Sequence, residues 1–313
     1  MILTDIESRI FEMTITINEA ADRGERKPLV SIGMPVRNGA NTLRVALDSL
    51  LAQTFADFEL LISDNDSTDD TEAICREYET LDERVRYVRQ QKNIGVVSNF
   101  QFVVDRARGD YFMWAAHDDT WGAKYIEAGI RVLVANPKAV AAIGVVKYLD
   151  TKGEVFGADF PPYTLNGDTF FRVCNYLRTN ITDHLIYGLY KTDFLFHNQL
   201  NTKVLCAEKQ VILRAVIAGG FEDAPGMTLY VKYSYRPRSD LRPLGLNPAW
   251  WQGFYSTYLM GQAILRQTPR RITYSLLWSL LRHRTPFFNR ILRGKLRPHP
   301  GRITYPTRSS DQW

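Results

Sequence analysis

The sequence predicts an α/β fold in which a mostly parallel sheet is flanked by helices, and three observations favour it. Short apolar runs that suit buried strands alternate with longer segments whose apolar residues recur at helical spacing. Several of the runs end in polar residues, as parallel strands do where a ligand binds. The chain has 313 residues, 45% of them hydrophobic, which is enough for a sizeable core.

The first two strand–helix pairs open this alternation. Residues 29–36, LVSIGMPV, form a short apolar run typical of a buried strand, and in 38–53 leucine and alanine recur at helical spacing. FELLISD, 58–64, is the next expected strand. The helix expected over 67–79 begins with Ser67, a favourable capping residue, and has acids in its first turn.

Two further pairs follow. Residues 84–90, RVRYVRQ, alternate apolar and charged side chains like a strand, and a helix is expected over 93–107 after a short loop. DYFMWAA, 110–116, predicts a strand, and 124–136 predicts a helix closed by an Asn-Pro pair. The run VAAIGVV then predicts one more strand. Strands joined by helices of this size form βαβ units and a mostly parallel sheet.

Three of the expected strands end in polar residues, at 35–38, 64–66 and 117–119. The carboxyl ends of parallel strands meet at one edge of a sheet, where ligands bind. Asp118 and Asp119 are adjacent carboxylates, which repel each other unless a cation offsets them. Because Mg²⁺ takes one or two protein carboxylates plus phosphate oxygens, the pair indicates a metal–diphosphate site. The alternative is that the pair caps the following helix or lies in solvent.

Motifs in a fixed order carry a resemblance to a known family. P-x-x-N follows the first strand at 35–38, S-x-L-x-Q-x-F ends the first helix at 49–55, and D-N-x-S-x-D-x-T follows the second strand at 64–71. Residues 91–119 add an N-x-G segment, an A-x-G-D-Y strand and an acidic cluster. Together these resemble the large inverting family-2 glycosyltransferases, which have the GT-A fold. The resemblance is close over 29–150 and looser to about residue 238.

The resemblance implies roles for the residues at the strand ends. Those that fall on its nucleotide-binding positions are Pro35, Val36, Asn38, Asp64 and Asp118. Asp64 would accept a hydrogen bond from the base, and Asp118 would contact the ribose or the metal shell. Asp119 would hold Mg²⁺ or Mn²⁺ against the diphosphate, where the metal polarises the leaving group. His117 stands where many members have another acid or threonine, and we interpret it as a satisfied histidine.

The catalytic base is assigned through the segment 206–221, which resembles the family's acid-then-helix segment. Glu208 takes the position of the carboxylate that removes the proton from the acceptor hydroxyl. It is one methylene longer than the family's aspartate, and its alternative role is that of a helix N-terminal acid. Asp183 is the competing carboxylate. Tyr187 and Gly188, close by, are expected to shape the acceptor pocket.

Arg236 and Arg238 lie in a segment that resembles the family's flexible arginine-containing stretch. They would reach the diphosphate when a loop closes, and the alternative is a solvated basic loop. The expected organisation is an N-terminal extension, a GT-A catalytic domain with a nucleotide-sugar-binding half and an acceptor-binding half, and a basic helical region. The extension covers 1–27 and the basic region covers 241–313. The catalytic domain covers 28–240, with its nucleotide-sugar-binding half at 28–120 and its acceptor-binding half at 121–240.

The charge is divided unevenly along the chain. Residues 241–313 hold twelve Lys/Arg and one acid, a sum of +11, whereas the remaining 27 basic and 33 acidic residues give the rest −6. Proline follows a capping residue at three places here, which predicts helices over about 248–267, 269–284 and 286–296. Their aromatic and leucine faces beside arginines suit an anionic membrane surface bound through 247–313. Packing on the catalytic domain is the alternative, and no nucleic-acid module is recognisable.

The N-terminal residues, the apolar content and the cysteines indicate where in the cell the protein lies. The first 27 residues lack the pattern of a signal peptide, and no window of 18 apolar residues predicts a membrane span. Three widely spaced cysteines without a metal-binding spacing suit a reducing compartment. The expected location is therefore cytoplasmic, with peripheral attachment to the inner face of the plasma membrane.

The expected function is an inverting, metal-dependent transfer of a sugar from a nucleotide-sugar to a glycan or lipid-linked saccharide. The expected donor is UDP-linked, and the expected setting is the assembly of cell-surface polysaccharide. Two alternatives stay open. A nucleotidyltransferase that makes sugar nucleotides should carry a glycine-rich phosphate loop after the first strand, where this chain has MPVRNGA. A non-catalytic nucleotide-sugar or glycan-binding protein would bind a donor without turning it over.

Overall fold

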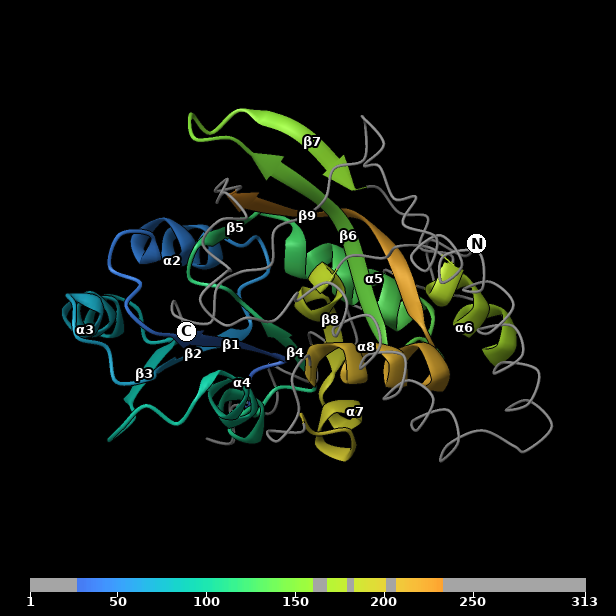
Figure 1. The fold of residues 1–313 in the computed structure, drawn as a ribbon, viewed down its shortest axis with the longest axis horizontal. Coiled ribbons are helices and arrows are strands. Elements are labelled where there is room, and N and C mark those ends of the chain that lie inside the picture. Colours follow the sequence, from blue (N-terminus) through green and yellow to red (C-terminus); the bar gives the residue numbers. More distant parts are fainter. Residues whose placement is uncertain (1–26, 160–167, 179–182, 201–206, 233–313) are drawn as a thin grey trace, which may run out of the picture.

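The computed structural model describes residues 27–159, 168–178, 183–200 and 207–232, which form an α/β fold around one sheet (Figure 1). The strands are β1 (Val30–Val36), β2 (Phe58–Asp64), β3 (Val85–Arg89), β4 (Tyr111–Trp114), β5 (Asp119–Trp121), β6 (Ala141–Leu149), β7 (Val155–Asp159), β8 (Leu189–Lys191) and β9 (Phe221–Lys232). The helices are α2 (Leu43–Leu51), α3 (Thr71–Leu81), α4 (Val96–Asp105), α5 (Tyr125–Ala135), α6 (Thr169–Arg178), the 3₁₀ helix η1 (Asp183–Tyr187), α7 (Thr192–His197) and α8 (Ala207–Ala218).

The sheet is parallel in its first part and mixed in its second. Its order is β3-β2-β1-β4-β8-β6-β9-β5, with β7 paired to β6. Strands β1 to β4 run parallel to their neighbours in that group, as the alternation of strands and helices predicted. The short strands β8 and β5 are antiparallel additions, and β6 and β9 are parallel to each other. The predicted α/β fold with a mostly parallel sheet is confirmed.

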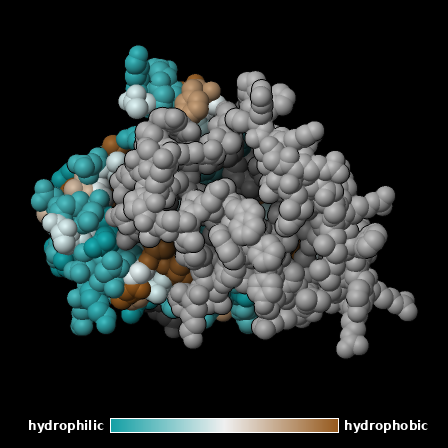
Figure 2. Space-filling model, in the orientation of Figure 1, coloured by the Kyte–Doolittle hydropathy of each residue, from teal (hydrophilic) through white to brown (hydrophobic). Residues whose placement is uncertain are grey.

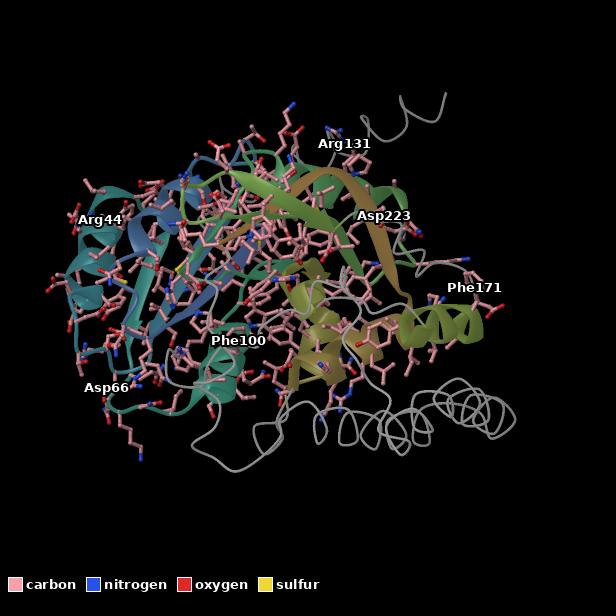
Figure 3. All side chains as sticks on the ribbon, turned by 45° about the horizontal axis from the view of Figure 1, so that its top comes forward. Arg44, Asp66, Phe100, Arg131, Phe171 and Asp223 are labelled. Carbon is pink, nitrogen blue, oxygen red and sulfur yellow. The ribbon has the colours of Figure 1, made fainter. Side chains whose placement is uncertain are left out.

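Helices cover the sheet and close its core. In Figure 1, α2 and α3 lie on one side of β1, β2 and β3, and α4 lies on the other. Helix α5 packs against β9 and β6, and η1 packs against α8. Figure 3 shows side chains filling the space between these layers, with Phe100 of α4 among them. Its ring stacks 6.4 Å from that of the fully buried Trp114.

Three predicted helix starts are too early, and one of them is the helix expected from residue 93, which begins at Val96. The helix expected from residue 38 begins at Leu43, and the one expected from Ser67 begins at Thr71. Asp70, not Ser67, is the residue at the helix cap. For α2 and α3, the reason is that residues 38–42 and 67–70 form loops whose polar groups bond to each other instead of to a helix end.

The sheet continues through the boundary expected at residue 120, so both expected halves share it. Within the described ranges no helix is both long and apolar enough to cross a bilayer. The flank formed by α2 and α3 is largely hydrophilic (Figure 2). The extension expected over 1–27, apart from Lys27, and the basic region 241–313 lie outside the described residues.

Candidate active site

Two loops, one after β1 and one after β2, are fastened to each other at the carboxyl edge of the sheet. The backbone N–H of Asn38 donates to Ser67 Oγ (2.9 Å), and the N–H of Thr68 donates to Asn38 Oδ1 (2.9 Å). The N–H of Gly39 donates to Thr71 Oγ1 (2.9 Å). These bonds satisfy polar groups that a loop would otherwise leave to water, so the strand ends are held in one arrangement.

Asn38 and Asp66 both adopt left-handed backbone conformations, with φ of 53° and 63°. Such values are uncommon outside glycine, and Asn and Asp tolerate them better than other residues. Each bends the chain directly after a parallel strand. Val36, which with Pro35 ends β1, accepts a hydrogen bond at its carbonyl from the N–H of Asn65 (2.8 Å). The expected nucleotide-binding positions 35, 36 and 38 therefore lie together at this edge.

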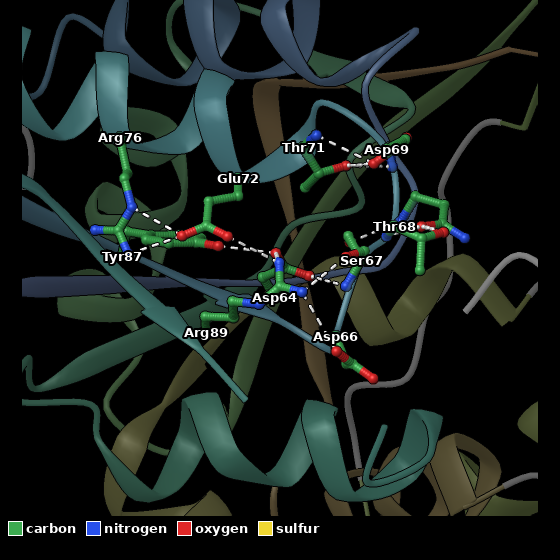
Figure 4. Close-up of polar contacts among 12 residues, drawn as sticks. Asp64, Asp66, Ser67, Thr68, Asp69, Thr71, Glu72, Arg76, Tyr87 and Arg89 are labelled. Atoms are coloured by element: carbon green, nitrogen blue, oxygen red, sulfur yellow. Dashed lines mark hydrogen bonds and ion pairs between the residues drawn. The ribbon is translucent and has the colours of Figure 1, made fainter. Parts of the chain in front are cut away.

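Asp64 is the centre of a buried hydrogen-bond network (Figure 4). Its Oδ1 accepts from the N–H of Ser67 (2.9 Å), and its Oδ2 accepts from Tyr87 Oη (2.8 Å). Arg89 lies 3.4 Å from the same Oδ2 and donates to the carbonyl of Ser67 (2.9 Å). The carboxylate thus binds the loop after β2, in addition to the base contact that the family resemblance implies.

The surroundings of Asp64 shift two pKa values. Burial, and then the hydrogen bond to Asp64, raises the pKa of Tyr87 well above its ordinary value. Burial, and then the charge of Asp64, raises the pKa of Cys75, a free and buried thiol. Because reactivity belongs to the thiolate, Cys75 is an inert core residue and not a nucleophile.

Asp118 and Asp119 follow β4 and open β5. The N–H of Ala115 donates to the carbonyl of Gly33 (2.9 Å), which prolongs the β1–β4 pairing toward them. Asp119 is 1% exposed and pairs with Val231 of β9, whereas Asp118 is half-buried. The pair precedes a strand and not a helix, and Asp119 does not lie in solvent. Both alternatives weighed from the sequence are therefore wrong for Asp119.

The motif at 49–55 holds the strand that carries Asp119. Ser49 Oγ accepts from the N–H of Trp121 (3.2 Å). Gln53 Nε2 donates to the carbonyl of Gly122 (2.9 Å), and its Oε1 accepts from the N–H of Ile126. The far edge of the sheet is thereby tied to α2. In the sequence, this motif is visible only through the family resemblance, which implies no role for Ser49 or Gln53.

His117 joins the acid pair to the loop after β1. It is buried, and its Nδ1 lies 3.1 Å from Thr42 Oγ1. A Cβ on Gly39 would come within 3.0 Å of the His117 ring, so glycine permits this close approach. The histidine is satisfied, as interpreted from the sequence. The packing also brings all three polar strand ends to one site.

The residues at this edge fit a divalent cation that shares its ligands with a diphosphate. Mg²⁺ and Mn²⁺ favour carboxylate and phosphate oxygens, and one or two protein carboxylates are enough when a nucleotide supplies the rest. Asp118 and Asp119 supply such carboxylates. In the part of the chain that the structure describes, no three His, Cys, Asp or Glu side chains form a metal site alone. The donor set therefore fits a metal held jointly with a nucleotide.

Arg37 is a residue of this edge that the sequence analysis did not single out. Its Nε is buried without a hydrogen-bond partner among the described residues. A buried donor without a partner costs about 1–3 kcal/mol, so such a group favours a water or a ligand as its partner. A guanidinium beside Asn38 suits an anionic ligand. The signal in the sequence is its position directly after β1.

The expected acceptor side is described in part. Glu208 lies half-buried in the first turn of α8, where the helix dipole favours an acid. Asp183 begins η1, which packs against α8, so both candidate bases come from adjacent elements. Tyr187 is buried, and a Cβ on Gly188 would meet the backbone of β6. Arg236 and Arg238 lie outside the described residues.

A cavity of about 440 Å³ lies at the opposite, amino edge of the sheet. Phe58, Arg84 and Arg108 are among its lining residues. Strand β2 runs from Phe58 at this edge to Asp64 at the other, so the cavity is separate from the acid pair. The candidate site is therefore identified by its strand ends and polar groups, and not by this cavity.

Solved structures share the fold at low sequence identity. S. aureus TarS in complex with UDP-GlcNAc matches with a TM-score of 0.62 and 15% identity over 82% of this chain and 73% of TarS. The mannosyltransferase PcManGT from Pyrobaculum calidifontis, in complex with GDP-Man and Mn²⁺, matches with a TM-score of 0.52 and 14% identity. That match covers 94% of this chain and 87% of the other. These likenesses show that the chain has the fold of GT-A glycosyltransferases.

Curated relatives are closer in sequence but shorter in coverage. An uncharacterized glycosyltransferase of Rickettsia bellii is 36% identical over 130 residues, 41% of this chain and 18% of that protein. The putative teichuronic acid biosynthesis glycosyltransferase TuaG of Bacillus subtilis is 30% identical over 118 residues, 38% of this chain and 47% of that protein. The chain thus matches less than half the length of either relative. The family model described as "Glycosyl transferase family 2" matches residues 31–205, more than half of the chain, and the chain therefore belongs to glycosyl transferase family 2.

Proposed function

We propose that this chain transfers a sugar from a nucleotide-sugar to a hydroxyl group of a glycan or lipid-linked saccharide, with inversion and with the help of a divalent metal. The observation that carries the proposal is the meeting of three polar strand ends at one edge of the sheet. The two loops are hydrogen-bonded to each other, and His117, directly before the acid pair, packs against one of them. Ligands of open α/β sheets bind at this edge.

The donor is a UDP-linked sugar in this proposal. Pro35, Val36 and Asn38 cradle the base, and Asp64 accepts a hydrogen bond from it. The UDP-GlcNAc bound by TarS, which shares the fold, supports this choice. The guanidinium of Arg37 contacts a phosphate, which would satisfy its buried Nε.

The metal is Mg²⁺ or Mn²⁺, held by Asp119 against the diphosphate. When bound it supplies a Lewis acid for the departing nucleoside diphosphate. Asp118 contacts the ribose or the metal shell. Arg236 and Arg238 complete the diphosphate contacts from beyond β9.

Glu208 removes the proton from the acceptor hydroxyl as that oxygen attacks the anomeric carbon. Attack from the side opposite the leaving group inverts the configuration, and the positive charge that develops on the sugar resembles that in glycoside hydrolysis. A half-buried acid in the first turn of a helix suits the role. Asp183, in the adjacent η1, is the alternative base.

The biological setting is the assembly of cell-surface polysaccharide at the cytoplasmic face of a membrane. The teichuronic acid enzyme among the relatives supports this setting. The basic segment 247–313 binds the anionic lipid surface, since each Lys or Arg near such a surface contributes about 1 kcal/mol.

A screen of nucleotide-sugars tests the enzymatic proposal. The full chain is incubated with UDP-, GDP- and dTDP-linked sugars, with Mg²⁺, with Mn²⁺ or with EDTA, and released nucleotide is measured. Release from one UDP-sugar class that requires metal is the expected result. Absence of release from every donor, with tight binding retained, would favour the non-catalytic binding protein.

Co-sedimentation with vesicles tests the membrane part. The full chain should pellet with anionic vesicles more than with neutral ones, and high salt should weaken this binding without abolishing it, because apolar contacts are not screened. Equal and negligible pelleting with both lipids would remove the membrane from the proposal.

A further inference from the structure

A cluster of aromatic and polar side chains lies where the β6–β7 hairpin meets η1. The Tyr148 ring lies 6.3 Å from that of Phe156 and 5.7 Å from that of His184, between ring centroids. Asp159 completes the group by accepting a hydrogen bond from Tyr148 Oη (2.6 Å). We name these four residues, Tyr148, Phe156, Asp159 and His184, the hairpin cluster.

A β-bulge turns Phe156 toward this cluster. Tyr148 pairs with Gly157 and Leu149 pairs with Val155, so Phe156 is the extra residue of β7. In regular pairing, a neighbour of Gly157 would point to the face opposite Tyr148. The bulge re-aims the side chain instead, and the two rings become neighbours. Bulges of this kind are enriched beside active sites.

The hairpin cluster offers apolar and polar groups together. Phe156 is 48% exposed, and the projecting hairpin carries apolar atoms among hydrophilic ones (Figure 2). Tyr148 Oη lies within 3.4 Å of His184 Nδ1 while it donates to Asp159, so carboxylate, phenol and imidazole form one chain. A half-exposed ring beside fixed hydrogen-bonding groups suits a ligand with an apolar face and a rim of hydroxyls.

The strand register aligns the hairpin cluster with the metal-binding position. Asp119 pairs with Val231, and Val231 pairs with Tyr148 on its other side. Directly paired residues point to the same face of a sheet. Two strand spacings separate Asp119 from Tyr148, about 10 Å. The hairpin cluster therefore lies about one disaccharide length from Asp119, on the same face of the sheet.

We propose that the hairpin cluster is the subsite that holds the acceptor saccharide, with a pyranose ring stacked on Phe156 and its hydroxyls bonded to Asp159 and His184. This inference rests on the proposed transferase function, and it names the acceptor as a saccharide at least two units long. The terminal unit lies beside Asp119, and the next unit lies on the hairpin cluster.

Binding to an array of immobilised di- to hexasaccharides, neutral and acidic, tests the subsite with the full chain. Phe156→Ala should weaken binding about tenfold, the scale of an aromatic contact. Tyr148→Phe keeps the ring but removes the hydroxyl, and should weaken binding about fivefold. Phe171→Ala is the matched control, because this phenylalanine is 52% exposed on α6 and should leave binding unchanged.

Metal-dependent nucleotide release without acceptor is measured on the same variants and should not change. Loss of saccharide binding in Phe156→Ala with unchanged nucleotide release supports the subsite. Equal binding by Phe156→Ala and the parent chain, or no saccharide bound by the parent, overturns it. A chain that releases nucleotide from no donor contradicts the transferase function, and the array alone then decides whether the hairpin cluster binds saccharides.

Discussion

The two edges of the sheet both bury a carboxylate, but they surround it differently. At the amino edge Glu59 is 2% exposed and is bonded to Ser31 Oγ (2.6 Å), Arg86 (2.9 Å) and Arg108 (2.7 Å). At the carboxyl edge Asp119 is 1% exposed and follows another acid directly. Two guanidinium groups neutralise Glu59, whereas Asp119 has a second acid, Asp118, directly beside it in the chain.

The difference teaches that burial alone does not identify a functional acid. Glu59 is as buried as Asp119, yet cations of the chain itself meet its charge, which is a structural use. Burial opposes ionisation of Glu59, but the hydrogen bonds from Arg108 and Ser31 hold its pKa below the ordinary value. For the adjacent carboxylates Asp118 and Asp119, the proposed use is to bind a cation, which would be functional.

The largest expected effect comes from replacing Asp119, the proposed metal ligand. Asp119→Ala should lower sugar transfer at least about 10⁴-fold, because a metal ion contributes several kcal/mol to stabilising the departing diphosphate. Steady-state kinetics and calorimetry of UDP with Mn²⁺ measure the two effects. Glu59→Gln is the control of equal burial, and it should retain turnover per folded molecule. Unchanged metal-dependent UDP affinity in Asp119→Ala would show that Asp119 is not the ligand.

Replacing Glu208, the proposed catalytic base, should have the next largest effect on transfer. Glu208→Gln keeps the shape but removes the proton acceptor, so transfer should fall by roughly 10²–10⁴-fold while donor binding persists. Transfer rates and donor affinity are measured beside Asp183→Asn. Normal transfer by Glu208→Gln together with an inactive Asp183→Asn would assign the base to Asp183.

The structural role of Glu59 at the amino edge is tested by measuring the free energy of unfolding. Glu59→Gln leaves two arginines without their acid, and we expect unfolding to become easier by about 2 kcal/mol, a buried-pair cost reduced because both arginines are about half exposed. Urea unfolding measures it. Glu77→Gln, which breaks an exposed pair with Arg44, should change stability far less, because solvent screens that pair.

The same variant has a pH signature. Because the pKa of Glu59 is lowered on folding, its stabilisation is present above the unfolded value of about 4.3 and is lost as the pH falls through the folded value. The stability difference between parent and Glu59→Gln should therefore shrink in acid. A difference that stays constant from pH 7 to pH 3 would contradict the ionic role of Glu59.

The smallest effect concerns Asp64. Tyr87→Phe removes the hydroxyl that donates to it, at a cost of about 1 kcal/mol in stability, and should weaken UDP binding a few-fold by loosening the loop after β2. Tyr78→Phe removes a comparable bond to Asp48, away from this edge, and should leave UDP affinity intact. Equal UDP affinity in both variants would limit Tyr87 to a packing role.

Where the sequence predicted well, the signal was local. The strand at 58–64 has the predicted bounds, because a short, mostly apolar run is typical of a buried strand. The three polar strand ends meet as expected, since parallel strands deliver their carboxyl ends to one edge. The start at Ser67 was wrong because its hydroxyl accepts from the N–H of Asn38, a partner 29 positions away.

Other features depend on distant pairing and left no local pattern. Strand β5 has three residues and is defined by its pairing with β9, so no periodicity predicts it. The buried Nε of Arg37 and the bulge at Phe156 are equally invisible in sequence, because each depends on how strands lie side by side. In the sequence, Glu59 is a single acid within an expected strand. Its two arginine partners, which reveal its role, become visible only in the structure.

The pairing of Asp119 with Val231 also sets an order of assembly. The two residues are about 110 positions apart along the chain. Bringing them together therefore costs conformational entropy before the contacts of the pairing can stabilise it. The strands β1, β2 and β4 leave the ribosome first and can pair while synthesis continues. Strand β5, which carries Asp119, gains its neighbour only when β9 emerges. A nascent chain can therefore pair its first strands early, and it fixes Asp119 in the sheet only after Val231 has been synthesised.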